Sequence, residues 1–258
     1  TSLTSLSIGG ANTISGDTSD LPINLTTCSI QGQNTISGTT SNLPTNLGSL
    51  TIQGQNTISG PTSGLPVNLT YCNIIGNNTI SGNTTGLPNN LVTLLIGGNN
   101  TISGDTSGLP TSLTYIDIEG DNTIGGDVSN LPSGLLTLYL HGSGTTLGSY
   151  ITGSVSNLPS NLSTCYILGY NQISGSFSNF PSTLSNIDIE GNNTISGYTA
   201  PHVWPTSMYN LIVIGNTTVS TTNINNILSD LATYSTTWLG GSKDLKLKGT
   251  STNSAAET

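Results

Sequence analysis

A repeat of 22 residues dominates the sequence. The tetrapeptide Asn-Thr-Ile-Ser recurs at this spacing, and Asn122 continues it as Asn-Thr-Ile-Gly; the earlier copies begin at Asn12, Asn34, Asn56, Asn78 and Asn100. Leu-Pro pairs keep the same period up to Leu131 and return at Leu158 after a five-residue insertion near residues 141–148. One such unit is too short to bury an apolar face alone, so the period predicts a solenoid of stacked coils.

A strand pattern, Leu-x-x-Leu-x-Ile, lies between each Leu-Pro and the next Asn, as in residues 25–30 and 113–118. Its last apolar positions alternate with polar ones, which predicts one inward face and one solvent face. A threonine column becomes Val128, Val155 and Phe177 in later coils, which indicates that this column is at least partly buried. The glycine of Ile-Ser-Gly is expected to adopt positive φ in a turn; the positions are Gly16, Gly38, Gly60, Gly82 and Gly104.

Charge excludes several classes of partner. The net charge is −9, only 6% of residues are charged, and the three cationic residues are Lys243, Lys246 and Lys248. Nucleic acids and anionic lipid surfaces are bound mainly through Lys and Arg, so neither is an expected partner. No apolar run is long enough for a transmembrane helix, so we expect no membrane insertion.

The repeat resembles a leucine-rich repeat, Leu-x-x-Leu-x-Leu-x-x-Asn-x-Leu, over roughly residues 1–220. It departs from that motif by placing three residues, rather than two, between the strand and the Asn. The resemblance implies an Asn ladder bonded to the turn backbone and a concave strand face that meets ligands. The ladder positions are Asn12, Asn34, Asn56, Asn78, Asn100, Asn122, Asn171 and Asn193. The expected fold class is an all-β-rich, flat, helix-poor solenoid of about ten coils.

The C-terminal residues differ from the repeat. We expect residues 1–220 to form the solenoid, and residues 221–258 to form a cap and tail. Apolar spacing predicts a short capping helix at about residues 223–233, behind a Thr or Asn cap, and a final strand at about residues 244–248. The chain starts within a repeat, so we expect earlier coils or a targeting signal before it.

Outward strand positions carry the candidate binding residues, which are Tyr71, Tyr115, Asp117, Tyr139, His141, Tyr166 and Asp188. Exposed aromatic rings beside carboxylates can stack on and hydrogen-bond sugars or peptide groups. Tyrosine is also a good strand former that packs along a sheet without any ligand. Both interpretations stay open at this point.

Acidic and thiol groups permit few cofactors. Asp117, Glu119 and Asp121 are a calcium candidate. The candidate is weak because calcium needs six to eight oxygen ligands, so a solvated acidic patch is the favoured interpretation. No other cofactor is expected. Cys28, Cys72 and Cys165 replace core Leu or Ile, which predicts buried free thiols.

Catalysis is not expected. The histidines His141 and His202 belong to no recognisable motif, and the acids, bases and cations that catalysis needs are scarce. Glycosylation sequons are frequent, as chance predicts for this composition, and their use is left open. They lie at Asn24, Asn68, Asn77, Asn83, Asn99, Asn161, Asn192 and Asn216.

Repeats that combine Leu-Pro-x-Asn-Leu-Thr with Asn-Thr-Ile-Ser-Gly are similar to those of phage tail or fibre proteins and bacterial surface proteins. The resemblance implies a non-enzymatic module of a virion appendage that recognises a host surface. Alternatives are a self-assembling subunit of an extracellular filament and a bacterial surface adhesin. The expected partners are a cell-surface glycan or protein, or copies of the chain itself. The expected location is the virion, the extracellular space or a cell surface.

Overall fold

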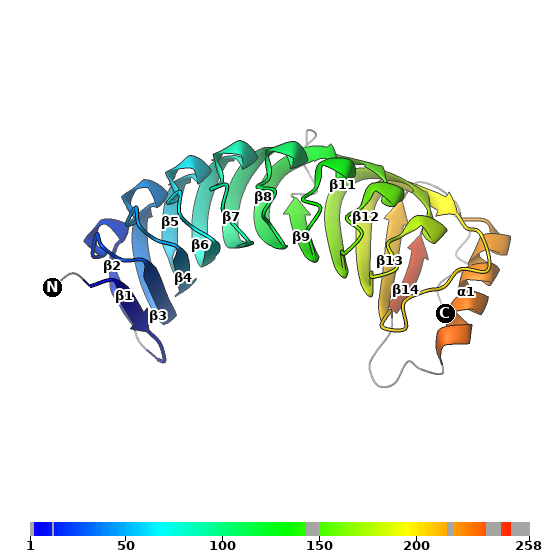
Figure 1. Cartoon of the computed structure of the whole chain (residues 1–258), viewed down its shortest axis with the longest axis horizontal. Coiled ribbons are helices and arrows are strands. Elements are labelled where there is room, and N and C mark those ends of the chain that lie inside the picture. Colours follow the sequence, from blue (N-terminus) through cyan, green and yellow to red (C-terminus); the bar gives the residue numbers. More distant parts are fainter. Residues whose placement is uncertain (1–2, 12, 143–149, 216–218, 236–243, 249–258) are drawn as a thin grey trace.

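The computed structural model describes residues 3–11, 13–142, 150–215, 219–235 and 244–248. They form an arch of stacked coils with one α-helix at its C-terminal end (Figure 1). The strands are β1 (Ser5–Ile8), β2 (Ser15–Asp17), β3 (Thr27–Thr39), β4 (Ser49–Gly54), β5 (Thr57–Pro61), β6 (Tyr71–Asn83), β7 (Thr93–Asp105), β8 (Tyr115–Asp127), β9 (Thr137–Gly142), β10 (Ile151–Ser154), β11 (Thr164–Ser176), β12 (Asn186–Gly197), β13 (Asn210–Gly215) and β14 (Asp244–Lys248).

Each coil adds one parallel strand to a long sheet, which we call the concave sheet. It is formed by β1, β4, β9, β13, β14 and the first halves of the longer strands. Cys28 pairs with Leu50, and Leu50 with Cys72, so equivalent residues of successive coils stand side by side. After a turn, β2, β5, β10 and the second halves of the longer strands form a second parallel ladder. The predicted strand-rich solenoid with a capping helix and a final strand is confirmed.

Short 3-10 turns follow the second ladder and lie along the outer edge of the arch (Figure 1). They are η1 (Thr18–Asp20), η2 (Thr40–Asn42), η3 (Thr62–Gly64), η4 (Thr84–Gly86), η5 (Thr106–Gly108), η6 (Val128–Asn130), η7 (Val155–Asn157) and η8 (Phe177–Asn179). The expectation of a flat solenoid was wrong. Paired strands on the inner edge stand about 4.8 Å apart, whereas a 3-10 turn on the outer edge is wider than a strand. The outer edge is therefore longer than the inner edge, and the stack curves.

The core is a set of buried columns inside the coils. From β3 to β13, the inward Leu, Ile and Cys side chains of the concave sheet are buried, and the threonine column is also buried, whereas Leu6 and Ile8 of β1 and Leu245 of β14 are partly exposed at the ends of the stack. Thr62 Oγ1 donates to the Asn83 carbonyl at 2.7 Å, and its equivalents make the same bond to the next coil. The predicted free thiols are confirmed as buried, and burial raises the pKa of Cys72 and of Cys165 to about 12.

The ladder asparagines are buried between coils rather than bonded only within their own turn. Asn100 Oδ1 accepts from the Ile80 N–H of the coil before at 2.9 Å, and its Nδ2 donates to the Glu119 carbonyl of the coil after at 3.2 Å. The same pair of bonds occurs at Asn34, Asn56, Asn78, Asn122 and Asn193. Asn171, the first ladder residue after the insertion, donates to Ile167 and Glu190. Asn12 lies outside the described residues.

The repeated glycine allows close approach between coils. Gly60 has φ +103°, and a Cβ there would come within 2.8 Å of Thr40 Oγ1 in the preceding coil. Gly38, Gly82 and Gly104 also have positive φ, as predicted, but they lie within strands of the second ladder rather than in a turn. Gly16 does not, and no described coil lies before it to require the close approach.

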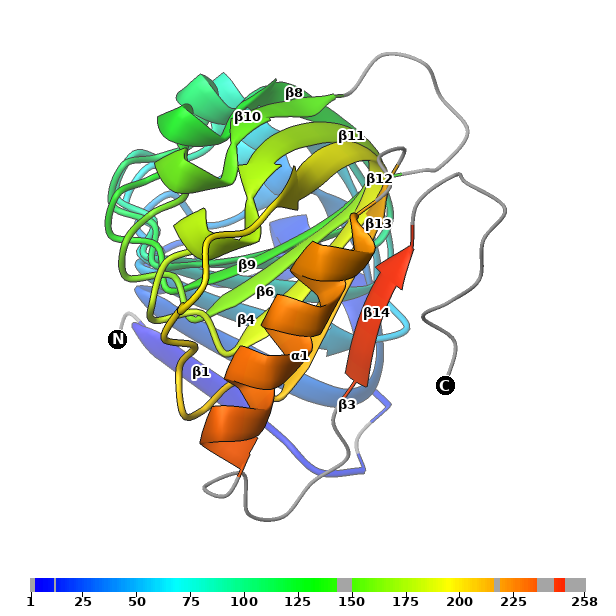
Figure 2. The same ribbon diagram turned by 90° about the vertical axis from the view of Figure 1, so that its right-hand side faces the viewer.

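Helix α1 (Thr221–Ser235) lies across the end of the stack, next to β14, which pairs with β13 (Figure 2). Ser220, rather than a Thr or Asn, accepts from the Asn223 N–H at the start of the helix. Asp230 of α1 accepts from Tyr198 Oη at 2.6 Å and from the His202 N–H at 2.8 Å. These bonds hold the helix on the last irregular coil, beside the buried ring of Trp204.

Candidate functional site

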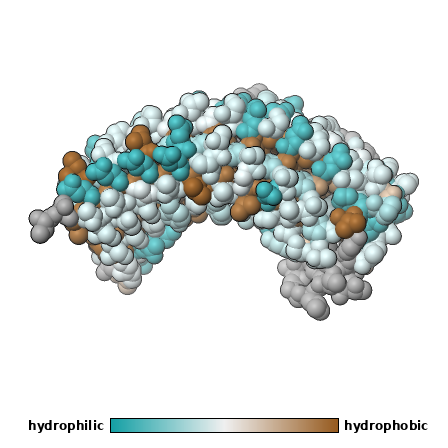
Figure 3. Space-filling model, in the orientation of Figure 1, coloured by the Kyte–Doolittle hydropathy of each residue, from teal (hydrophilic) through white to brown (hydrophobic). Residues whose placement is uncertain are grey.

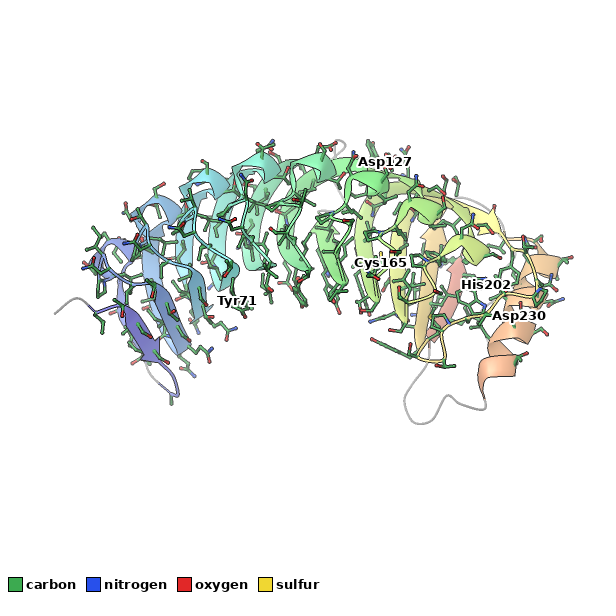
Figure 4. The ribbon with its side chains drawn as sticks, in the orientation of Figure 1. Tyr71, Asp127, Cys165, His202 and Asp230 are labelled. Atoms are coloured by element: carbon green, nitrogen blue, oxygen red, sulfur yellow. The ribbon has the colours of Figure 1, made fainter. Side chains whose placement is uncertain are left out.

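The concave sheet presents its outward side chains in columns along the inner side of the arch. Figure 4 shows Tyr71 on this inner side and Asp127 on the opposite, outer edge. The first column runs through Tyr71, Thr93, Tyr115, Thr137, Thr164, Asn186 and Asn210. The second column runs through Asn73, Leu95, Asp117, Tyr139, Tyr166, Asp188 and Ile212. His141 pairs with Leu168 at the next outward position.

The structure therefore divides the predicted binding residues between neighbouring columns. Tyr71 and Tyr115 belong to the first column and are separated by Thr93. Tyr139, Tyr166 and the two aspartates belong to the second column. All the predicted residues are partly buried, and none is fully exposed.

Three of the tyrosines form a continuous strip across β8, β9 and β11. The ring centroids of Tyr139 and Tyr166 are 4.7 Å apart and stacked, and those of Tyr115 and Tyr139 are 6.4 Å apart. Aromatic pairs at these distances stabilise one another, and their remaining faces can stack on a ligand. We call Tyr115, Tyr139 and Tyr166 the tyrosine strip.

Three asparagines on this face were missed by sequence reasoning. Tyr166 Oη donates to Asn186 Oδ1 at 2.8 Å, and Asn210 Nδ2 donates to the same oxygen at 2.9 Å. Asn73 Nδ2 lies 3.4 Å from Tyr71 Oη. All three amides are at most 8% exposed. Their only sequence signal is an amide at an outward strand position, which is inconspicuous in a chain this rich in Asn.

Hydrogen-bond acceptors are in excess on the concave face. Among the described residues, Asn73 Oδ1, Asp188 Oδ1 and Asn210 Oδ1 are buried and have no hydrogen-bond donor. All three belong to the two outward columns. An unmet buried acceptor costs about 1–3 kcal/mol, so such atoms in a stable fold mark places where water, an ion or a ligand supplies the donor.

The carboxylates of the second column are destabilised in their charged form. Burial, and then the charge of Glu190, raises the pKa of Asp188 to about 6, while Lys246 lowers it. Burial and Glu119 raise the pKa of Asp117, and His141 opposes them. Burial raises the pKa of both Tyr115 and Tyr139, and neighbouring tyrosines and Asp117 add to the effect. This environment favours a ligand that carries positive charge and N–H donors.

The calcium candidate at Asp117, Glu119 and Asp121 stays a prediction. In the described part of the chain, no group of three His, Cys, Asp or Glu side chains is arranged to hold a metal ion. Asp117 and Glu119 share a strand face, whereas Asp121 follows the turn at Gly120, where the chain leaves the concave sheet.

The sequons lie in several places, and their glycosylation stays a prediction. The asparagines at positions 24, 68, 77, 83, 99 and 161 are exposed, and Asn192 is partly exposed. Asn83 also accepts from the Thr85 N–H and so caps a 3-10 turn. Asn216 lies outside the described residues.

Comparison with known proteins decides the fold. The chain is similar to the plant receptor ectodomain GASSHO1/SCHENGEN3 of Arabidopsis thaliana, a leucine-rich-repeat domain, with TM-score 0.53, 21% identity and coverage of 81% of this chain and 25% of that one. The chain has a leucine-rich-repeat fold. A TDR receptor is similar with TM-score 0.53 and 19% identity, over 83% of this chain and 43% of that one. The PEPR1–AtPEP1 structure is similar with TM-score 0.51 and 21% identity, over 83% of this chain and 35% of that one.

The chain spans less than half the length of each of these solved chains. No family model matches its sequence, and no curated protein sequence matches it. Within the described residues, no helix has the length and apolarity needed to cross a membrane. On the flank shown in Figure 3, apolar side chains form small separate patches among polar ones, so that flank offers no broad apolar surface for docking.

Proposed function

We propose that this leucine-rich-repeat chain is a non-catalytic binding module whose concave face holds a protein or glycan ligand outside the cell. The observation that carries the proposal is the tyrosine strip, which lies in the same two columns as three buried acceptors without donors. Large aromatic faces supply contact area with little loss of side-chain entropy, and unmet acceptors supply specificity once a ligand pairs with them.

The scaffold supports this use because it fixes the side chains before binding. The tyrosines stand on strands paired on both sides, and Tyr166 is also held by its bond to Asn186. A site on such rigid elements needs little ordering when the ligand arrives. The solved GASSHO1/SCHENGEN3 ectodomain is in complex with CASPARIAN STRIP INTEGRITY FACTOR 2, which shows that a similar fold can serve as a receptor.

The test is a binding screen of immobilised glycans and peptides with the wild-type chain and two variants. We expect the double variant Tyr115→Ala, Tyr139→Ala to lose at least about tenfold in affinity for any partner found, since each ring removes a stacking surface. The control is Val67→Ala, which removes an apolar side chain 71% exposed and outside the concave columns. If the double variant binds every confirmed partner as tightly as the wild type, the concave face is not the binding site.

A finer proposal concerns where the module works. The similarity of its repeats to those of phage tail and fibre proteins supports a place on a virion appendage, with the concave face turned to the host. Antibody labelling of purified virions, with detection at the tail, would support this placement. Labelling of the cell surface in uninfected bacteria would favour the adhesin alternative.

The filament alternative predicts a different solution behaviour. An open solenoid end can pair with another chain, because its edge strand has unpaired backbone groups. Light scattering of the isolated chain should give a monomer if the module acts as a binder, and long polymers if it is a filament subunit.

A further inference from the structure

The second outward column places two carboxylates at either end of an aromatic pair. Asp117 on β8 stands beside Tyr139 on β9, which stands beside Tyr166 on β11, which stands beside Asp188 on β12. Strands in a sheet are about 4.8 Å apart, so three strand spacings separate the two carboxylates by about 14 Å. The column therefore reads as acid, aromatic, aromatic, acid along the axis of the arch.

Donors are missing toward both ends of the two outward columns. Asn210 uses its amide N–H groups on Asn186 and Tyr166, which leaves its own Oδ1 without a donor. Asp188 Oδ1, in the second column on the neighbouring strand β12, also has no donor, and neither does Asn73 Oδ1 at the other end of the second column. Asn73 and Asn210 are 6% and 8% exposed, so bulk water has little access to them. The face lacks N–H groups where it has buried oxygen atoms.

We infer that the ligand of the concave face is an extended basic peptide segment whose two cationic side chains, four residues apart, pair with Asp117 and Asp188. This inference rests on the proposed binding function and names the class of its ligand. Between the two cations, the peptide lays an apolar side chain on Tyr139 and Tyr166. N–H groups of the peptide backbone and of its flanking residues donate to Asn73 Oδ1 and Asn210 Oδ1, which lack a donor within the chain.

The spacing follows from strand geometry. An extended chain rises about 3.4 Å per residue, so four residues cover the roughly 14 Å between the carboxylates. Successive side chains of an extended chain point to opposite sides, so an even separation puts both cations on the same side. The path from Asn73 on β6 to Asn210 on β13 crosses six spacings, or about 29 Å, which corresponds to about nine residues.

The charges of the face favour a cationic partner over a neutral one. Glu119 and Glu190 lie two residues from the two aspartates on the same strands, and the whole chain has net charge −9. Lys246 on β14, next to Ile212, lies beyond the column and is the cation that lowers the Asp188 pKa. A ligand ammonium or guanidinium group removes the mutual repulsion of these acids, and the net charge speeds its approach.

The probe is the nine-residue peptide acetyl-GSKTLTKSG-amide, measured by calorimetry at low salt. Its sequence reads the same in both directions, so the result does not depend on the orientation in which it binds. Acetyl-GSETLTESG-amide reverses the charge, and acetyl-GSKTLKTSG-amide moves one lysine to the opposite side of the strand. We expect each control peptide to bind at least about tenfold more weakly, because charge-assisted hydrogen bonds require both sign and position.

Matched variants locate the contact. Asp188→Asn and Asp117→Asn should each weaken binding of the lysine peptide by about tenfold. Asp127→Asn removes the same charge on the outer edge, where Asp127 caps η6 through the Ser129 N–H. Asn is as good a capping residue as Asp, and Asn83 caps a 3-10 turn at the same repeat position. The Asp127→Asn control should therefore keep both the fold and the affinity for the peptide. Melting temperatures of all variants show whether each one is folded.

The outcomes separate the inference from the function on which it rests. Equal affinity for the three peptides, or unchanged affinity in folded Asp117→Asn and Asp188→Asn, overturns the basic-peptide ligand. If a neutral glycan binds instead and the Tyr115→Ala, Tyr139→Ala variant loses it, the binding function stands and the ligand class is wrong. If the Tyr115→Ala, Tyr139→Ala variant binds every peptide and glycan as tightly as the wild-type chain does, both proposals fail.

Discussion

Asparagine does two different jobs at the scale of single residues. In the ladder, Asn100 satisfies one backbone N–H of the coil before and one carbonyl of the coil after. On the concave face, Asn73 and Asn210 instead leave an acceptor without a donor. The same side chain stabilises the stack where the backbone surrounds it, and marks a binding surface where side chains surround it.

Replacing a ladder asparagine should be costly. Asn100→Ala takes the acceptor from the buried Ile80 N–H and the Asn100 donor from the partly buried Glu119 carbonyl, so we expect the free energy of unfolding to fall by about 2–5 kcal/mol. Urea denaturation measures this. Asn99→Ala, at the exposed neighbouring position, should change stability by less than about 0.5 kcal/mol. Similar losses for the two variants would contradict a ladder role.

The buried carboxyl of Asp188 should make stability depend on pH. Its folded-state pKa of about 6 lies above the ordinary value of 3.8, so the unfolded chain releases this proton first as pH rises. The contribution of Asp188 to the free energy of unfolding therefore falls between about pH 4 and pH 6. Above that range the charged Asp188 destabilises the folded state. We expect Asp188→Asn to raise the melting temperature at pH 7.5 and to have little effect near pH 3.5. An equal effect at both pH values would show that ionisation is not the cause.

Helix α1 ends the stack at the scale of secondary-structure elements. Its buried residue Ile227 packs on the core, and Asp230 ties it to Tyr198 and His202. Burial lowers the pKa of His202, while Asp230 opposes that effect. The cap thus depends on one carboxylate that gathers donors from a different coil.

Removing that carboxylate should loosen the cap before the rest of the chain. Asp230→Ala leaves the Tyr198 hydroxyl and the His202 N–H without their acceptor, so we expect amide exchange in α1 to speed up about tenfold. Hydrogen exchange read by mass spectrometry checks this, and amides of β6 to β8 serve as the internal reference. Asn225→Ala, exposed on the same helix, should leave the rate unchanged. A uniform change along the chain would argue against a local role.

The whole molecule behaves as a stack whose unit is one coil. Contacts run from each coil to its neighbours, and equivalent residues pair at an offset of 22, as Cys28 does with Leu50. Stability in such a stack is approximately a sum of coil and interface terms. Whole coils should therefore be removable, whereas fractions of a coil should not.

Deletion of residues 34–55 removes one full period and joins Gln33 to Asn56. We expect a folded monomer with unchanged far-UV dichroism per residue and unchanged affinity for the lysine peptide, because the Asp117 to Asp188 spacing is untouched. Deletion of residues 34–44 removes half a period and should give an aggregated or unfolded product, since it turns apolar columns outward. A folded half-period deletion would contradict the coil unit.

Much of the fold and part of the candidate site could be predicted. The strands, the buried threonine column and the free thiols follow from local periodicity, and the tyrosines and aspartates are conspicuous at outward positions. The unmet acceptors of Asn73, Asp188 and Asn210 could not be predicted, because they depend on which donors the neighbouring coils use up. The Ser220 cap and the conformation of Gly16 depend in the same way on local surroundings.

The repeat by itself determined that this chain winds into coils, because a period of 22 residues returns Leu, Ile and Asn to the same place in every turn. Only the tertiary structure decided how the coils curve and which outward side chains meet. Tyr139 stacks on Tyr166 although 27 residues separate them, because the five extra residues fall between β9 and β10 and strand pairing restores the register. The binding face is thus a product of pairing across coils, and no single repeat contains it.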